Sequence, residues 1–120
     1  MPQITVDYSD SLESAFDRRS FALALHPLIV ETIDTQLSAC KTRFRRVDET
    51  VVAGGTPGDA PGDALVHIGI AVLPGRSPEL KAQLSEAVLE LLAGHLGHAE
   101  GIAPIISAEV RDLEPSYRKR

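Results

Sequence analysis

Cysteine and aromatic residues are scarce in this chain. Of its 120 residues one is cysteine and none is tryptophan, and two tyrosines and three phenylalanines bring the aromatic share to 4%. A single cysteine, Cys40, can form neither an internal disulfide nor a CxxC pair. Disulfide scaffolds, zinc ribbons and thioredoxin-like redox sites are therefore excluded together.

Basic residues are fewer than acidic ones, and long apolar runs are absent. The chain has 12 Lys and Arg against 17 Asp and Glu, a formal charge of −5, which argues against nucleic acid as its main partner. Apolar stretches such as 21–25 and 28–30 fall far short of a bilayer span, and no basic-then-apolar leader precedes them. We expect no membrane partner and a cytoplasmic location.

The chain does contain an ordinary share of core-forming residues. It is 43% hydrophobic and 24% charged, which suits one packed domain over residues 1–120. Alternating apolar and polar residues predict strands over 2–8, 40–48 and 64–73, and a last strand is expected over 105–113. We expect these strands to form one sheet.

Two helices separate the strands. The first runs from about residue 11 toward 35, after a run of capping side chains, and Pro27 should kink or break it near His26. The second begins at 77–78, where a serine cap precedes a proline, carries one apolar stripe, and ends at the stretch marked by Gly94 and Gly97. A helix between two strands predicts a crossover that joins them in parallel.

The element order is β-α-β, a Gly/Pro-rich loop at 54–63 that we expect to be flexible, and β-α-β again. Two halves of about equal length imply a weak internal repeat, each half with two parallel strands joined by a right-handed crossover. The predicted fold class is α+β, a four-stranded mixed sheet with both helices on one face. The other face is assigned Gln3, Thr5, Thr42, Phe44, His67 and Gly69. This mixture of polar and apolar side chains predicts contact with other subunits.

Pro2 is the first candidate catalytic residue. Met1 before a small second residue is usually removed, which leaves the secondary amine of Pro2 at the amino terminus. An ordinary α-amino group has a pKa of about 8, and burial or neighbouring cations lower that pKa far enough for the group to act as a general base. Pro2 shares a strand face with Ile4 and Val6, so partial desolvation is expected. The alternative is that Pro2 simply starts an ordinary strand.

A set of cations stands out in this acidic chain. Its members are Lys41, Arg43, Arg45, Arg46 and Arg76. Planar arginine forks suit carboxylates, so these residues could clamp a dicarboxylate substrate and also lower the pKa of the Pro2 amine. The alternative is a solvated edge strand whose charge prevents aggregation.

The histidines and the cysteine point to little chemistry. His95 and His98 are three residues apart but have no third ligand at an obvious spacing, so we predict no metal site. His67 either lines a site or packs at a subunit interface, His26 is assigned a structural role, and Cys40 is expected to be a small buried filler. No GxSxG, Walker or GxGxxG pattern occurs.

Four local features together carry a resemblance to a known family. They are Met1-Pro2 before a short strand, Arg43 in a strand ending Val47-Asp48, Val66-His67 in the third strand, and Gly75-Arg76-Ser77 before the second helix. With them the whole chain resembles the 5-carboxymethyl-2-hydroxymuconate delta-isomerase family of the tautomerase superfamily. The register runs without a gap from Met1 to about Asp48, and the second half follows after an insertion in the 54–63 loop.

The resemblance implies a tautomerase-like domain, a homotrimer and no cofactor. It implies that Pro2 moves a proton between the 2-hydroxyl of a dienol and a distant carbon, first as base and then as acid. Arg43 and Arg76 would bind substrate carboxylates and stabilise the developing enolate charge. Arginine is usual in the family at position 41, whereas Lys41 is a point charge that makes no bidentate contact.

The sequence therefore predicts a cofactor-independent isomerase or tautomerase of unsaturated 2-hydroxy carboxylates, such as 5-carboxymethyl-2-hydroxymuconate, in aromatic-compound catabolism. Its substrate is a small dicarboxylate or tricarboxylate bound by Arg43, Arg76 and Lys41. Two enzyme alternatives keep the fold and Pro2, namely a generic keto-enol tautomerase and a dehalogenase of small unsaturated acids. A further alternative is a non-catalytic ligand-binding module, because β-α-β-β-α-β is also the ferredoxin-like pattern.

Overall fold

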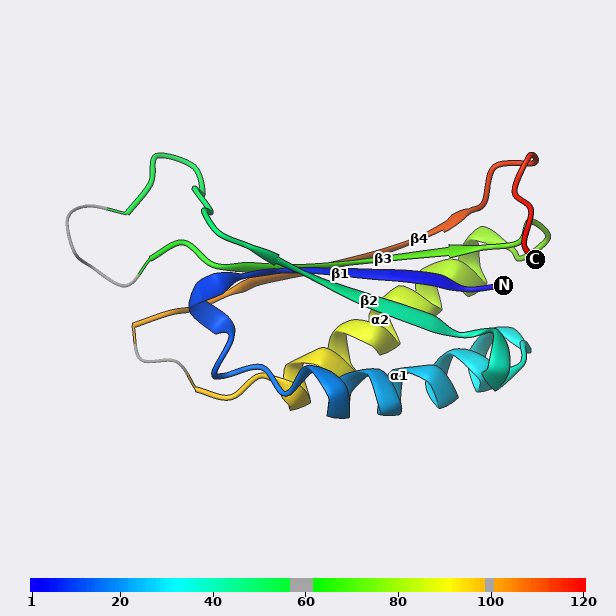
Figure 1. The fold of residues 1–120 in the computed structure, drawn as a ribbon, viewed down its shortest axis with the longest axis horizontal. Helices are drawn as coiled ribbons and strands as arrows, with labels where there is room; N and C mark the ends of the chain where they lie inside the picture. Colours follow the sequence, from blue (N-terminus) through cyan, green and yellow to red (C-terminus); the bar gives the residue numbers. More distant parts are fainter. Residues whose placement is uncertain (57–61, 99–100) are drawn as a thin grey trace.

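The computed structural model describes residues 1–56, 62–98 and 101–120. Its strands and helices are β1 (Gln3–Ser9), α1 (Arg18–Ile33), β2 (Lys41–Val47), β3 (Leu65–Val72), α2 (Pro78–His95) and β4 (Ile105–Asp112). Short 3-10 helices precede α1, at Asp10–Leu12, and β2, at Leu37–Ala39. Figure 1 shows two layers, with both helices against one face of the sheet. The predicted α+β class and element order are confirmed.

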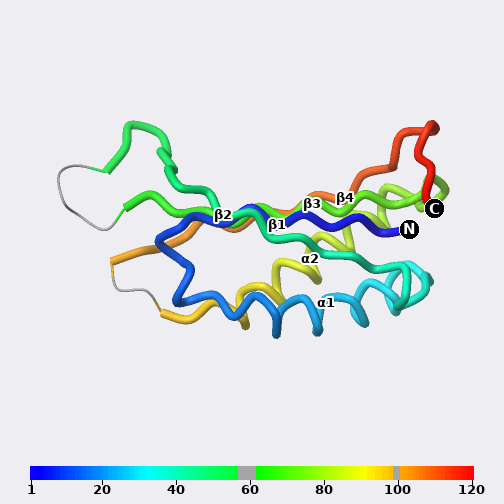
Figure 2. The backbone as a smooth tube through the Cα atoms, in the orientation of Figure 1, coloured from blue at the N-terminus to red at the C-terminus, as the bar shows by residue number. Residues whose placement is uncertain are grey.

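The four strands form one sheet in the order β2-β1-β3-β4. β1 pairs with β2 in parallel and with β3 antiparallel, and β3 pairs with β4 in parallel. Each β-α-β half therefore contributes one parallel pair, and the antiparallel contact of β1 with β3 joins the halves into the predicted mixed sheet. As a result β1 and β2 start, and β3 and β4 end, at the same edge of the sheet, by which we mean the side formed by the ends of the strands. Both chain termini lie at this edge (Figure 2).

The core lies between the sheet and the two helices. Along β1 every second side chain is buried, and Ile4 and Val6 are fully so. The helices bury residues at the four-residue spacing of one helical face. The buried positions are Phe21, Leu25, Ile29 and Ile33 in α1, and Leu84, Val88 and Leu92 in α2. Each fully buried side chain of this size stabilises the fold by about 1.5–3 kcal/mol, so the helices bind firmly to one sheet face and leave the other open.

The strand register corrects part of the predicted open face. Ile4 pairs with Thr42 and Val6 pairs with Phe44, so both β2 residues lie on the side that the helices cover. Phe44 packs edge-on against Phe16, with 6.0 Å between the ring centroids. Placing Thr42 and Phe44 on the open face was wrong, because alternation within one strand does not say which of its faces matches the neighbouring strand. The residues that do lie on the open face as predicted are Gln3, Thr5, His67 and Gly69.

The first helix begins later than predicted. Residues 10–12 form a 3-10 turn, and α1 begins at Arg18 with Asp17 as its cap. The Asp17 carboxylate accepts a hydrogen bond from the Ser20 N–H at 3.2 Å. The helix runs without a break through Pro27, which is exposed. The carbonyl that loses its donor to the proline therefore lies on the solvent side of the helix.

The Gly/Pro-rich loop predicted at 54–63 lies only partly within the structure, because 57–61 fall outside the described residues. Its described ends are tied together by Asp63. The carboxylate of Asp63 accepts hydrogen bonds from the Val52 N–H and the Thr56 hydroxyl, both at 2.9 Å.

The second helix begins as predicted. The Ser77 hydroxyl oxygen accepts a hydrogen bond from the Leu80 N–H at 3.1 Å, and Pro78 occupies the first helical position. The helix ends at His95, between the two glycines, Gly94 and Gly97, that mark its predicted end. Within the described ranges no helix is long and apolar enough to cross a membrane.

The cap of α2 can be tested by stability. In Ser77→Ala one amino-terminal N–H of the helix loses its partner, and we expect the free energy of unfolding to fall by about 1 kcal/mol. The measurement is urea denaturation at a fixed protein concentration. Ser20→Ala is the control, because it removes a first-turn serine of α1 whose hydroxyl makes no hydrogen bond with the residues described. Equal losses in the two variants would contradict the capping role of Ser77.

Candidate active site

The amino terminus lies at the sheet edge where several segments meet. Pro2 is buried and precedes β1 at the edge where β2 starts and β3 ends. Parallel pairing places Gln3 beside Lys41, so Pro2 lies level with Cys40. The carboxyl terminus ends beside the amino terminus (Figure 1). The burial of Pro2 agrees with the strand face on which the sequence places it.

The α-amino group, carried by Met1, lies in a partly desolvated and cationic environment. Burial lowers the pKa of this amine most, and Arg76, Lys41 and Lys119 lower it further. Cys40 has the opposite effect. Burial and positive neighbours both disfavour the ammonium form, so the amine becomes neutral at a lower pH than an ordinary α-amino group.

Arg76 is held on the turn between β3 and α2. Gly75 before it has a φ of +123°, a conformation that L side chains rarely adopt, so the turn requires glycine there. The half-buried guanidinium donates from Nη2 to the Ile33 carbonyl oxygen at 3.1 Å and from Nη1 to that of Leu73 at 3.3 Å. Ile33 is the last residue of α1, and the terminal carbonyls of a helix attract cations. The ends of α1 and β3 therefore hold the guanidinium in place.

Lys41 and Arg43 lie two residues apart on the open face of β2. The Lys41 ammonium donates to the carbonyl oxygen of Ala39 at 3.0 Å. The Arg43 guanidinium donates to Gln3 Oε1 at 2.9 Å and to the Thr5 hydroxyl at 3.4 Å. Lys41 is among the charges that lower the pKa of the amine, whereas Arg43 is not. The structure thus brings Lys41 to the amine and places Arg43 about 7 Å further along the strand.

Ion pairing divides the five predicted cations into two groups. Arg45 pairs with Asp7 at 2.6 Å, and Arg46 pairs with Asp10 at 3.5 Å and with Glu13 at 3.0 Å. The other three cations donate only to neutral oxygens and have no carboxylate within ion-pair distance in the part of the chain that the structure describes. They are Lys41, Arg43 and Arg76. An anion that binds to these cations displaces no carboxylate of the protein.

Cys40 is half-buried and packs against the core, on the face opposite Lys41 and Arg43 as the sequence predicts. Its Sγ lies 4.0 Å from the carbonyl oxygen of His26 and 3.8 Å from that of Gln36. Burial raises the pKa of the thiol, while Lys41 and the amine lower it. The parallel register sets residue 40 beside the amino terminus, a neighbour that cannot be read from one strand alone.

Three of the four histidines make polar contacts, and none of the four is among the groups that shift the pKa of the amine. His26 Nε2 lies 2.7 Å from the Thr42 hydroxyl, and burial lowers the pKa of this histidine. His67 lies on the open face, with Nδ1 2.7 Å from the Ser107 hydroxyl. His95 Nδ1 lies 2.9 Å from a backbone carbonyl oxygen one turn earlier in α2. Among the residues described, no group of three or more His, Cys, Asp or Glu side chains could hold a metal ion.

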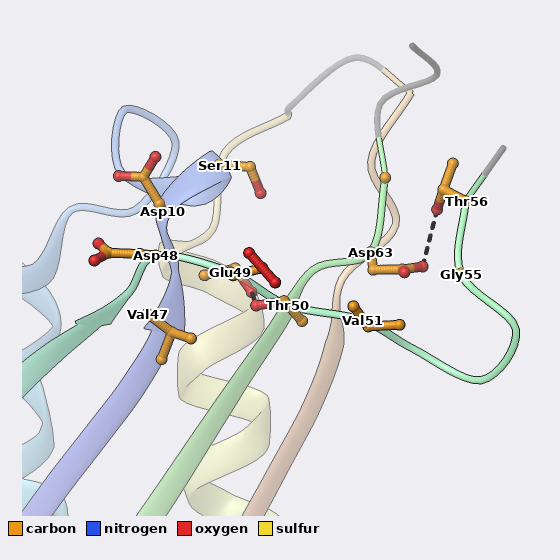
Figure 3. Close-up of a pocket in the computed structure, with 12 residues that line it drawn as sticks. Asp10, Ser11, Val47, Asp48, Glu49, Thr50, Val51, Gly55, Thr56 and Asp63 are labelled. Atoms are coloured by element: carbon orange, nitrogen blue, oxygen red, sulfur yellow. Dashed lines mark hydrogen bonds between the residues drawn. The ribbon is translucent and has the colours of Figure 1, made fainter. Parts of the chain in front are cut away.

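A cavity of about 440 Å³ lies at the opposite edge of the sheet. Figure 3 shows its acidic lining, which includes Asp10, Asp48, Glu49 and Asp63. The seven residues of β1 separate this cavity from the amine, a length of roughly 20 Å at the rise of a strand. Its carboxylates repel an anionic ligand, so this cavity does not suit the carboxylate substrate that the sequence predicts.

Gln3, Tyr117 and Lys119 complete the surroundings of the amine, and the sequence alone does not point to them. Gln3 Nε2 donates to the Tyr117 hydroxyl at 3.1 Å, although the two residues are 114 positions apart. Lys119 Nζ lies 3.8 Å from the Met1 Sδ. Only the sheet order, which brings the end of β4 to the edge where β1 starts, puts these residues within reach.

Solved structures of known proteins share this fold. A 5-carboxymethyl-2-hydroxymuconate isomerase from Deinococcus radiodurans R1 matches with a TM-score of 0.77 at 23% identity, over 98% of this chain and 88% of that chain. A structure described as a fused 4-OT wild type symmetric trimer matches with a TM-score of 0.70 at 19% identity, over 96% of this chain and 90% of that chain. The mixed four-stranded sheet with two helices on one face is the fold of the tautomerase superfamily.

Sequence comparison narrows this class to one family. The profile of the family described as 5-carboxymethyl-2-hydroxymuconate isomerase matches residues 2–120. The 5-carboxymethyl-2-hydroxymuconate Delta-isomerase of Escherichia coli is 26% identical over 117 residues, which are 97% of this chain and 90% of that protein. The chain belongs to the 5-carboxymethyl-2-hydroxymuconate isomerase family, and it is an isomerase of the tautomerase superfamily. The family resemblance drawn from the sequence is confirmed.

The electrostatics of the amine can be tested by titration. Arg76→Gln should raise the pKa of the amine toward that of an ordinary α-amino group, because it removes a positive charge that disfavours the ammonium form. The measurement is NMR of the isotope-labelled α-amino nitrogen across a pH series. Arg45→Gln is the matched control, since it removes a guanidinium that pairs with Asp7 and should leave the pKa of the amine unchanged. The same pKa in both variants would contradict the effect of Arg76.

Proposed function

We propose that this isomerase converts an unsaturated 2-hydroxy (dienol) carboxylate into its conjugated 2-oxo form without a cofactor, with the Pro2 nitrogen as general base and then general acid. The substrate is a small dicarboxylate or tricarboxylate such as 5-carboxymethyl-2-hydroxymuconate, the compound in the name of the Escherichia coli relative. The observation that carries the proposal is the amino terminus itself. Burial, Arg76 and Lys41 all lower the pKa of its amine, which favours the neutral form that accepts a proton.

The mechanism requires removal of Met1, so that Pro2 supplies the amine. Proline is small enough at the second position for a methionine aminopeptidase to act. The new amine belongs to a buried residue that directly follows Met1, so we expect the desolvation and the cations that lower the pKa of the Met1 amine to lower its pKa as well. A neutral secondary amine carries a lone pair and can accept a proton near neutral pH.

The reaction moves one proton and two double bonds. The neutral amine takes the proton of the 2-hydroxyl group, and the electrons of the O–H bond form the C2 carbonyl. The two carbon–carbon double bonds of the diene are replaced by a single one, which joins the two middle carbons of the diene. The far carbon of the diene then takes the proton back from the prolinium nitrogen. No atom is gained or lost and nothing is oxidised, so the step needs no cofactor.

Arg76 and Lys41 supply the positive charge that this step needs. The intermediate spreads a negative charge from the oxygen to the far carbon, and fixed cations beside the amine stabilise that charge. Arg76 is already held by the carbonyl oxygens of Ile33 and Leu73, so it needs little reordering when substrate binds. Arg43 has no carboxylate partner among the residues described, and we assign it a distal carboxylate of the substrate.

A homotrimer is the proposed working form, with one domain of residues 1–120 in each subunit. The helices leave one sheet face uncovered (Figure 1). The strand register places Gln3, Thr5 and His67 on that face. Two similar structures are described as symmetric trimers. A cytoplasmic location and the absence of nucleic-acid and membrane partners stay predictions of the sequence.

Of the three alternative functions, one is excluded by the family and two are separated from the proposed function by experiment. The interpretation as a non-catalytic, ferredoxin-like binding module is wrong, because the chain belongs to a family of isomerases. The generic keto-enol tautomerase and the dehalogenase keep Pro2 as the reacting group, so substrate assays with and without a conjugated dienol separate them from the proposed function.

Pro2→Ala tests the base directly. Ketonisation of 2-hydroxymuconate and of its 5-carboxymethyl derivative is followed by ultraviolet absorbance, and kcat should fall by about 100-fold or more, as expected for a positioned general base. In the wild type, kcat/KM should rise with pH through a pKa below ~8, because loss of a proton from a depressed amine creates the base. Mass spectrometry first establishes that Met1 is absent from both proteins. Unchanged turnover in the variant, or Met1 retained in active enzyme, would remove Pro2 from the mechanism.

Arg43→Ala tests the carboxylate clamp. It should lower kcat/KM for a dicarboxylate dienol by about tenfold or more, because a charged hydrogen bond is lost, and it should affect a monocarboxylate dienol much less. Arg45→Ala is the matched control, since Arg45 lies two residues away on the same face but is paired with Asp7. Equal losses on the two substrates in Arg43→Ala would count against the clamp.

A further inference from the structure

The carboxyl-terminal tail, residues 113–120, folds back onto the sheet edge that carries the amine. The Leu113 N–H donates to the Val72 carbonyl oxygen at 2.6 Å, which joins the start of the tail to the end of β3. The Glu114 carboxylate accepts hydrogen bonds from the Ser116 hydroxyl and N–H, and these lower the pKa of that carboxyl. The Tyr117 N–H then donates to the Glu114 carbonyl oxygen at 2.9 Å. The tail is therefore a hydrogen-bonded turn with positioned side chains.

Tyr117 is linked to Arg43 through Gln3. The half-buried Tyr117 presents its hydroxyl to Gln3 Nε2 at 3.1 Å, and Oε1 of the same amide accepts from Arg43 Nη2 at 2.9 Å. The donor end of the amide meets the phenol and its acceptor end meets the guanidinium, so both partners orient Gln3. Gln3 and Arg43 also line a hollow of about 270 Å³ on the open face, to which Leu113 of the tail contributes. The tail thus orders Gln3 and, through it, Arg43 on the open face.

Lys119 reaches the amino terminus itself. Its Nζ lies 3.8 Å from the Met1 Sδ, and its charge is among those that lower the pKa of the Met1 amine. Removal of Met1, which the proposed function requires, takes away this sulfur contact and leaves the Lys119 ammonium facing the end of the chain that Pro2 then forms. In the ranges that the structure describes, no carboxylate pairs with Lys119. The neighbouring Arg118 instead donates to the carbonyl oxygens of Pro115 and Tyr117, at 3.1 and 2.8 Å. Of these two adjacent cations, Lys119 lies at the amine and Arg118 closes the turn of the tail.

We infer that the tail is a wall of the active site, in which Lys119 binds a carboxylate of the substrate and Tyr117 positions Arg43 through Gln3. The inference rests on the proposed function, because it assigns further parts of the same site. Lys41 and Arg76 serve the reacting end of the substrate, and Arg43 serves a distal carboxylate. Lys119 then supplies a separate cation for a third carboxylate, so the site favours tricarboxylate over dicarboxylate dienols.

Lys119→Gln tests the carboxylate contact, and Arg118→Gln is the matched control because it removes the same charge one residue away. For each variant kcat/KM is measured on 5-carboxymethyl-2-hydroxymuconate, which has three carboxylates, and on 2-hydroxymuconate, which has two. Lys119→Gln should lower the ratio of the two values by about tenfold, since it removes a charged hydrogen bond to only one substrate. Arg118→Gln should leave the ratio within about twofold. Equal losses on both substrates in Lys119→Gln, or equal ratios in the two variants, would overturn the assignment.

Tyr117→Phe tests the positioning role, because it removes only the hydroxyl to which Gln3 donates. KM for the tricarboxylate should rise by about three- to tenfold with kcat unchanged, since Arg43 binds substrate and does not react. Tyr117→Phe together with Arg43→Ala should be no worse than Arg43→Ala alone, because a positioning residue acts only through its partner. Losses that add in the double variant, or a fall in kcat with KM unchanged, would overturn this role.

The inference and the proposed function fail in different ways. If Pro2→Ala leaves turnover intact, the proposed function is wrong, and so is the role of the tail in that active site. If Pro2→Ala abolishes turnover while Lys119→Gln behaves like Arg118→Gln, the proposed function stands and the inference about the tail is wrong.

Discussion

The pairing of β1 with both of its neighbours is the constraint on which the candidate site depends. The parallel contact with β2 sets Gln3 beside Lys41, and the antiparallel contact with β3 brings the end of β3, followed by Arg76, to the same edge. β4 runs parallel to β3, so the tail with Lys119 arrives at this edge as well (Figure 1). Segments from the start, middle and end of the chain therefore meet at the amine because of one set of hydrogen-bonded ladders.

Ion pairing then decides where positive charge acts. The chain as a whole has a formal charge of −5, yet the cations beside the amine donate to neutral oxygens while Arg45 and Arg46, further along β2, are neutralised by carboxylates. The acidic cavity, whose lining Figure 3 shows, includes the last residues of β1 and β2 and so lies at the opposite edge. An acidic protein thus keeps a positive edge and a negative edge, and an anion is attracted to the one and repelled by the other. The same positive edge lowers the pKa of the amine.

Local patterns predicted the elements of this fold but not which side chains share a face. Alternation predicted the strands, and the serine cap with its following proline predicted the start of α2, because these signals depend on neighbouring residues only. Thr42 and Phe44 were misplaced because an isolated strand has two equivalent faces until a partner sets its register. The start of α1 was misplaced because residues 10–12 also carry capping side chains, yet they form a 3-10 turn ahead of the true cap at Asp17.

By itself the sequence determined the family resemblance, the element order, the one-sided apolar pattern and the candidate residue types, Pro2 and a group of cations. It left open which of those cations are free of carboxylates, where Arg43 lies relative to the amine, and that the tail reaches the site. These features depend on contacts such as that of Gln3 with Tyr117, 114 positions away along the chain. Only the tertiary structure decided them, because charge and hydrogen bonding act through distance in space, and the sheet order sets that distance.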